Sequence, residues 1–376
     1  MRTTTNCMKE SNLFYELIRV AVGQQVCLSH TPSVDEWGEL YAMAKKQSLV
    51  GVCFAGVQRL QAQRQEPPEM LYLTWMGMAA KIQQRNEVVN RQCVQLGERL
   101  KSEGYSYCVL KGQGVAALYK VSRVSDGFIV SDLSALRQSG DIDVWISGSR
   151  EKTLAYVQKV SPTNMVTMLH AELSVFPDTD VEVHFIPTYL RCPWKNRRLQ
   201  AWFEEFEGFE KFPIVNGFRV PTDEFNLVFL ALHIFRHLLG EGIGMRQLMD
   251  YYFVLKHVQD SDTRDRACDV LNSLGLGKFA GALMWICEKV FGLSKEAMLC
   301  APDSTLGQMI LQEIELAGNF GQHDERSKDD ESSWHRFWRT NATNLRFLWY
   351  FPEEVLCTPF YRVWHKCWQW KHGYVG

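Results

Sequence analysis

Two acidic residues separated by a single position, Asp141 and Asp143, are the part of the sequence that most directly suggests chemistry. They lie in the segment DIDVWI, whose alternating apolar residues predict a β-strand, and side chains two positions apart on a strand point to the same face. Two carboxylates held so close repel each other, and a divalent cation or a cationic side chain relieves that repulsion. The pair is a candidate metal site if other parts of the chain bring suitable groups to it.

A third carboxylate is offered by the segment VEVH at residues 181–184, where Glu182 and His184 are expected to share one face of another strand. Three acidic groups on adjacent strands can hold two Mg²⁺ ions, which clamp the attacking and leaving oxygens of a phosphoryl or nucleotidyl transfer. We expect His184 to orient a carboxylate rather than to bind metal directly. Glu172, on the preceding strand-like segment, is a competing third carboxylate.

Lys111 and Gly112 follow a predicted strand at residues 105–110. A glycine at the end of a strand lets a phosphate approach backbone N–H groups, and a lysine beside it supplies positive charge. We therefore expect these two residues to contact a phosphate group. The alternative for Lys111 is a structural pairing with a carboxylate.

Further candidates lie before the acidic pair and in later helices. Arg137 either contacts substrate or pairs with the acidic cluster. His233 and His237 are four apart on one helix face, and their spacing favours helix packing, with His237 a possible substrate contact. Arg246 and Asp250 are also four apart, which favours an intrahelical ion pair, although both could fix substrate if they lie near the cleft.

The elements that must position these residues are expected to form a small mixed β-sheet in the core, residues 104–190. The pattern predicts the order β-α-β-α-β-β. We expect strands at 105–110, 141–146, 165–176 and 181–186, helices at 116–119 and 149–159, and a loop or hairpin at 121–134.

Helical patterns flank this core, so the fold class is α+β. Residues 1–103 are expected to form an N-terminal helical module, and residues 191–320 a C-terminal helical module that makes the other wall of the cleft. Residues 321–376 are expected to form a polar loop and an aromatic, basic tail. For this tail, a helix packed on the body is favoured over contact with a membrane surface or nucleic acid.

Composition restricts the class of protein. The 376 residues are 46% hydrophobic and 22% charged, with a net charge of −2, which is typical of a globular protein without the positive field that binds long nucleic acids. No apolar run has the length of a signal peptide core or membrane span, so we expect a cytoplasmic location. The eleven cysteines contain no C-x-x-C pair and are expected to be reduced thiols.

Taken in chain order, three motifs resemble the uncharacterised nucleotidyltransferase family met in bacterial polysaccharide gene clusters, within the DNA polymerase β-like superfamily. They are Leu110-Lys111-Gly112, then Arg137 followed by Gly140-Asp141-Ile142-Asp143, then Val181-Glu182-Val183-His184. His237, Arg246 and Asp250 also resemble that family's helical segment, and the likeness covers residues 10–320. The sequence departs from the superfamily in its Gly-Gln turn at Gly112, in the longer gap before Asp141, and in a Glu as third acid.

The resemblance implies metal binding by Asp141, Asp143 and Glu182 and phosphate contact by Gly112, with Lys111 and Arg137 also at the nucleotide. It implies transfer of a nucleoside monophosphate from an NTP to an acceptor hydroxyl, with Mg²⁺ as cofactor. The nucleotide base and the acceptor stay open. A non-catalytic nucleotide-binding or scaffold protein that retains the fold is the alternative.

Overall fold

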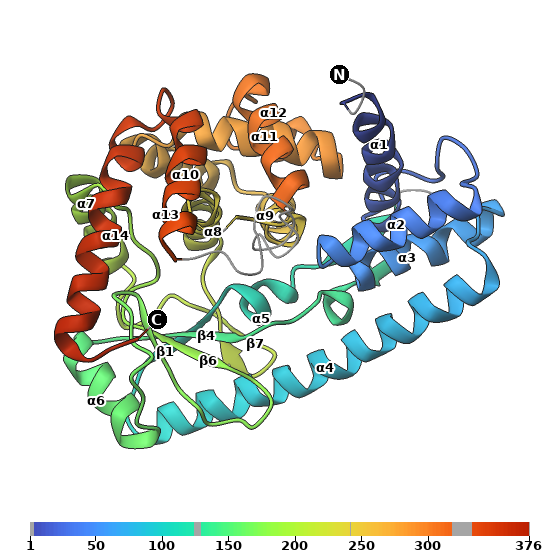
Figure 1. The fold of residues 1–376 in the computed structure, drawn as a ribbon. Coiled ribbons are helices and arrows are strands. Elements are labelled where there is room, and N and C mark those ends of the chain that lie inside the picture. Colours follow the sequence, from blue (N-terminus) through green and yellow to red (C-terminus); the bar gives the residue numbers. More distant parts are fainter. Residues whose placement is uncertain (1–3, 124–128, 241, 318–332, 376) are drawn as a thin grey trace.

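The structure is a computed structural model, and it describes residues 4–123, 129–240, 242–317 and 333–375. Helices surround a small mixed sheet, so the chain combines α and β structure as expected (Figure 1). Residues 321–332 of the expected polar loop and residues 124–128 of the expected loop or hairpin lie outside the described residues.

The helices that precede the sheet are α1 (Thr4–Ala21), α2 (Val34–Lys46), α3 (Val50–Leu60) and α4 (Glu69–Ser102). The Ser33 hydroxyl accepts a hydrogen bond from the Glu36 N–H, and the Glu36 carboxylate accepts one from the Ser33 N–H, so a capping box starts α2. Helix α4 is 34 residues long and extends from the other N-terminal helices to the sheet, beneath which it lies in Figure 1.

The central sheet has the strand order β1 (Tyr107–Leu110), β4 (Ile142–Ile146), β6 (Val181–His184) and β5 (His170–Glu172). Strand β4 is antiparallel to β1 and parallel to β6, and β5 is antiparallel to β6. Helix α6 (Arg150–Val160) begins the connection that returns the chain for the parallel pairing. The predicted mixed sheet is confirmed.

Strand β5 is much shorter than the strand expected at residues 165–176. The Thr167 hydroxyl accepts hydrogen bonds from the N–H groups of Leu169 and His170, and the Thr167 N–H donates to the His170 carbonyl. A threonine side chain that bonds nearby backbone in this way favours a turn over an extended strand. The prediction was therefore wrong in length, although it placed the strand in the right region.

Side chains alternate between the two faces of the sheet. Ile142, Val144 and Ile146 pack into a core that also contains apolar residues of α4 and α6. Trp145 points to the opposite face, where its ring stacks on Phe225 at a centroid distance of 5.8 Å. Polar residues that share this second face therefore point toward the C-terminal helices.

Strand β1 leads directly into α5 (Lys111–Ala116), so the helix expected at residues 116–119 is wrong in position. A glycine is required at position 114, because a Cβ there would lie 2.4 Å from the carbonyl oxygen of Val109. The next segment contains the paired strands β2 (Lys120–Arg123) and β3 (Ile129–Asp132), one of the two alternatives expected for this region.

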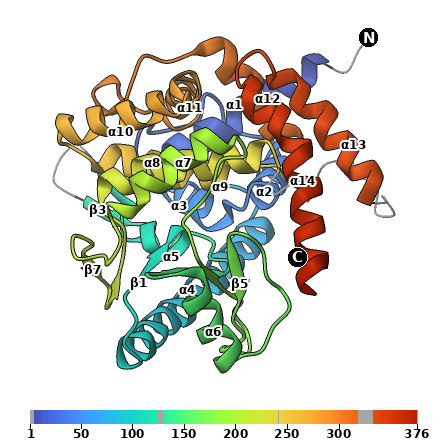
Figure 2. The ribbon, with the colours of Figure 1, turned by 90° about the vertical axis from the view of Figure 1, so that its left-hand side faces the viewer.

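The C-terminal elements are mainly helical, with a small hairpin between α7 and α8. They are α7 (Pro193–Glu204), β7 (Ile214–Val215), β8 (Phe218–Arg219), α8 (Asp223–Leu238), α9 (Met245–His257), α10 (Ser261–Ser273), α11 (Gly277–Phe291), α12 (Ser304–Ala317), α13 (Ser333–Asn344) and α14 (Pro352–His372). Short 3-10 turns are η1 (Gln61–Gln63), η2 (Ser134–Leu136), η3 (Lys295–Ala297) and η5 (Leu345–Phe347). Figure 2 shows α8 and α9 above the sheet, with α4 and α6 below it.

One hydrophobic core joins the N-terminal and C-terminal helices. It contains Leu17 of α1, Cys53 of α3, Phe229 of α8 and Phe279 of α11, all of which are buried. The two helical modules expected from the sequence thus share their apolar surfaces, and the boundaries between them stay predictions. None of the described helices is long and apolar enough to cross a membrane.

Candidate active site

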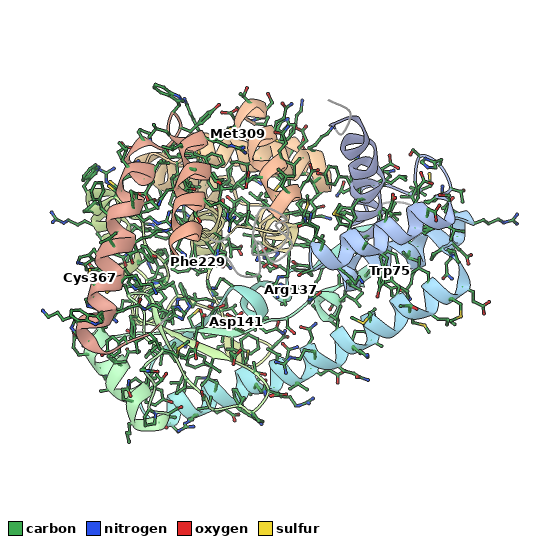
Figure 3. The ribbon with its side chains drawn as sticks, viewed as in Figure 1. Trp75, Arg137, Asp141, Phe229, Met309 and Cys367 are labelled. Atoms are coloured by element: carbon green, nitrogen blue, oxygen red, sulfur yellow. The ribbon has the colours of Figure 1, made fainter. Side chains whose placement is uncertain are left out.

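A pocket of about 300 Å³ lies between the open face of the sheet and helices α8 and α9. The sheet side contributes Lys111, Gly112, Gly140, Asp141, Asp143, His170 and Glu182. Helices α8 and α9 contribute Leu230, His233, Ile234, Arg236, His237, Arg246, Gln247 and Asp250, and Arg137 reaches the pocket from the segment before β4. Figure 3 labels Asp141 and Arg137 near the centre of the molecule, below the helix that carries Phe229.

Asp143 and Glu182 are neighbours because β4 and β6 run parallel with these two residues in register. His184 Nε2 lies 2.8 Å from Asp143 Oδ1 and 3.6 Å from Glu182 Oε2. Ligand atoms of these three residues all fall within 4.8 Å of one another, so the cluster could hold a cation. His184 is buried behind the carboxylates and does not line the pocket, which suits an orienting role.

Lys111 is held against the same carboxylate. Its Nζ lies 2.7 Å from Asp143 Oδ1, and its side chain is largely buried. The backbone there is strained, because Lys111 has φ of +46° and Gly112 has φ of +36°, in the region that favours glycine. The turn thus directs the lysine to Asp143, the pairing that the sequence left as the alternative to phosphate contact.

The opposite charges in the site shift the pKa values of Asp143, His184 and Lys111. Burial alone would raise the pKa of Asp143, but Lys111 and His184 outweigh it and hold that pKa well below the usual range. Burial likewise opposes protonation of His184, yet its hydrogen bonds to Asp143 and Glu182 raise the pKa of its imidazole. The charges of Asp143, Glu182 and Asp141 overcome burial and raise the pKa of Lys111. Asp143 is therefore held ionised by Lys111 and by the hydrogen bond from His184.

Asp141 lies one residue before β4, lines the pocket and is exposed, unlike the buried Asp143. The negative charge of Asp143 raises the pKa of Asp141 to about 6. This mutual repulsion is the property expected of the pair from its spacing. A divalent cation between the two carboxylates would relieve it.

The carboxylates suit a hard divalent cation: Asp143 and Glu182 belong to the close cluster, and Asp141 lines the same pocket. Asp141, Asp143 and Glu182 offer carboxylate oxygens to one pocket, and Mg²⁺ prefers oxygen ligands. Glu172 is aligned with Glu182 on the neighbouring strand, but it does not line the pocket. The geometry therefore favours Glu182 over Glu172 as the third carboxylate.

Arg137 joins the segment before β4 to helix α9. Its Nε and Nη2 donate to the two carboxylate oxygens of Asp250 at 2.7 and 2.8 Å, and the Tyr119 hydroxyl donates to Asp250 at 2.5 Å. Both partners of the ion pair are buried. The sequence suggested Arg246 as the partner of Asp250 and the acidic cluster as a partner of Arg137, so this cross-element pair was missed.

The helical wall of the pocket is rich in nitrogen. Arg246 donates to the carbonyl of Gln138 at 3.0 Å, while Arg236 and His237 lie in contact at 3.1 Å. The His233 and His237 rings have centroids 4.4 Å apart, as their spacing on one face predicts. Burial, followed by the charge of Lys111, holds the pKa of His233 well below its ordinary value.

Two ionisable pocket residues, Arg236 and His170, were not singled out from the sequence. Arg236 lies next to His237 on α8, and a search of that segment for cations could have found it. His170 faces the site because β5 pairs with β6, and its Nδ1 lies 3.2 Å from Glu182 Oε2. Strand β5 has only three residues, which is too short for sequence alternation to show which way His170 points.

A family model described as "Uncharacterised nucleotidyltransferase" matches residues 33–292. This range contains every residue of the pocket and both of its walls, whereas α14 lies beyond it. No match was found among curated proteins or among solved structures.

Proposed function

The chain belongs to the uncharacterised nucleotidyltransferase family, and from this membership we propose that it transfers a nucleoside monophosphate from an NTP to an acceptor hydroxyl in a metal-dependent reaction. The observation that carries the proposal is the alignment of Asp143 with Glu182 on parallel strands, with Asp141 in the same pocket. This arrangement supports the metal site expected from the sequence.

We assign Asp141, Asp143 and Glu182 to Mg²⁺, with two ions as the expected number. When bound, such ions neutralise charge on the transferring phosphoryl group and on the attacking and leaving oxygens. His184 and Lys111 hold Asp143 in a fixed orientation through contacts of 2.8 and 2.7 Å, so the carboxylate needs little rearrangement on loading.

The reaction requires an oxygen of the acceptor to form a bond to the α-phosphorus while the bond to the bridging oxygen of the leaving pyrophosphate breaks. Glu182 is the group we assign to the acceptor proton, because its side chain is partly exposed in the pocket. Arg236 and Arg246 face the sheet from α8 and α9 and supply positive charge for the triphosphate. Gly112 completes the phosphate side, where Lys111, paired with Asp143, and Arg137, paired with Asp250, add positive charge to the same pocket.

A second function is favoured by one specific observation. Asp143 is compensated by two side chains of the protein, Lys111 and His184, as a structural carboxylate would be. A protein that binds nucleotide but does not turn it over, or that serves as a scaffold, would be compatible with such a site.

Incubation with Mg²⁺, α-labelled NTPs and cell extract as a source of acceptor distinguishes the two. We expect labelled product and pyrophosphate from the wild type, and neither from Asp143→Asn or Glu182→Gln. Glu172→Gln is the matched control, since it removes an equivalent charge from the next strand outside the pocket, and it should retain activity.

Wild-type protein that forms no more product than Asp143→Asn would contradict the enzymatic proposal. Equilibrium dialysis with the same labelled NTPs then decides what remains. Retained nucleotide binding without turnover would support the non-catalytic alternative.

A further inference from the structure

The outer face of α14 is strongly apolar although it is exposed. Phe360 and Trp370 are 77% and 86% exposed, and these values are high for large apolar side chains in a folded protein. Exposed positions with the same character also include Leu356, Val363, Trp364 and Cys367. An apolar surface of this kind marks an interaction site.

These residues form one stripe along the helix. Leu356, Phe360, Val363, Cys367 and Trp370 are separated by alternating steps of four and three, which places them on a single face. The opposite face of α14 is fixed to the body of the protein, since Thr358 and Gln369 are buried there. Figure 3 shows Cys367 at the outer edge of the molecule, away from the pocket near Asp141.

Contacts of the inner face hold α14 in place. The guanidinium of Arg150 lies between the rings of Phe185 and Trp368, at 4.2 and 4.9 Å from their centroids. Tyr361 stacks on Tyr189 at a centroid distance of 4.9 Å. The apolar stripe is thus presented by a helix that is already anchored, and its binding does not require the helix to fold.

The charges beside the stripe have one sign. Lys366 and Lys371 are exposed at its two edges, and no acidic residue occurs after Glu354 in the sequence. The two acids at the start of the helix are engaged within the molecule. Glu353 lies 3.2 Å from Lys195 Nζ, and Glu354 accepts hydrogen bonds from the backbone N–H of Arg191.

We propose that this face of α14 binds an anionic lipid surface, with the helix lying in the plane of the interface. Tryptophan and phenylalanine insert at the boundary between headgroups and acyl chains, and lysines at the edges of such a helix contact anionic headgroups. A second copy that docks through its own α14 fits less well, because the acids of that helix are already engaged within their own molecule. The inference does not depend on the proposed transfer reaction.

Cosedimentation of the full chain with vesicles tests the proposal. The probes are vesicles of phosphatidylcholine alone and of phosphatidylcholine mixed with phosphatidylglycerol. We expect binding to the anionic vesicles that weakens as salt is added, because salt screens the lysines.

Two variants separate the apolar and charged contributions. Phe360→Ser with Trp370→Ser should weaken binding by about tenfold or more, because the inserted rings are lost. Lys366→Glu with Lys371→Glu should weaken binding to anionic vesicles to a similar degree while keeping the apolar stripe. Met70→Ser with Leu73→Ser is the matched control, since it removes exposed apolar residues from α4, and it should bind like the wild type.

Circular dichroism should show the same helix content for all variants, because the replaced side chains are exposed. Absence of wild-type binding to anionic vesicles, or equal loss in the α4 control, would overturn the proposal. A concentration-dependent dimer in light scattering that disappears in the Phe360→Ser, Trp370→Ser variant would also overturn it, in favour of self-association.

Discussion

Removing one member of the ion pair between Arg137 and Asp250 should strongly destabilise the protein, because the pair is buried and joins the segment before β4 to α9. Its two hydrogen bonds are 2.7 and 2.8 Å long, and both side chains are about 5% exposed. Removing one member of a buried pair leaves an uncompensated charge, which costs about 3–5 kcal/mol. Both residues line the pocket, so we expect the lower end of this range, about 3 kcal/mol, for Arg137→Met and for Asp250→Asn.

The order of the two effects follows from Tyr119. After Arg137→Met, the Tyr119 hydroxyl still donates to Asp250, whereas Asp250→Asn leaves the buried guanidinium without its carboxylate. We therefore expect Asp250→Asn to be the more destabilising change. The double variant should cost less than the sum of the single ones, because it leaves no unpaired charge.

Urea unfolding followed by far-UV circular dichroism measures these losses of stability as shifts of the unfolding midpoint. The dependence of the unfolding free energy on urea concentration should stay the same in every variant. Arg99→Met is the control. It breaks the exposed pair with Glu103 one helical turn away, which should cost about 0.3–0.5 kcal/mol. Shifts for Arg137→Met and Asp250→Asn that do not exceed the Arg99→Met shift would refute the reasoning.

Three further outcomes are expected. Gly114→Ala should destabilise the protein by about 1–3 kcal/mol, because its Cβ would clash with the Val109 carbonyl. Gly38→Ala, on α2 with open space around it, should stabilise the protein by about 0.5–1 kcal/mol. Equal urea midpoints for the two variants would contradict this. At neutral pH, iodoacetamide should label the exposed Cys367 in the native protein, and Cys287 only after unfolding, because burial raises the pKa of the Cys287 thiol; peptide mass mapping checks it. Chelation should remove transferase activity, Mg²⁺ should restore it and raise the melting temperature, and the Asp143→Asn protein should show no such rise.

Much of the fold around the site follows from periodicity. The alternation in DIDVWI and VEVH predicted two strands with their acids on one face, and the structure confirms that Asp143 and Glu182 lie side by side in a mixed sheet. The family match supports the resemblance that the ordered motifs indicated. The assignment of metal and phosphate contacts to individual residues stays a prediction.

Long-range partners were the part that local patterns could not predict. Arg246 and Asp250 fit the spacing of an intrahelical pair, yet the carboxylate of Asp250 is bound by Arg137 from a distant loop. Which cation pairs with Asp250 depends on how the sheet packs against α9, and the spacing of residues along one helix does not predict that packing. The short β5 shows the opposite case, because the Thr167 hydroxyl forms a turn just before the strand, within a segment whose pattern suggested a longer strand.

The core shared by α1, α3 and α11 affects how the chain folds while it is being synthesised on the ribosome. Roughly 200 residues separate the end of α3 from the start of α11, and a ribosome adds about 5–20 residues per second, so the delay is about 10–40 s. During that interval the apolar faces of α1 and α3 lack the surface they finally bury against. The nascent chain therefore completes its N-terminal half only after most of its C-terminal half has emerged, and shielding by a chaperone would favour its folding over aggregation.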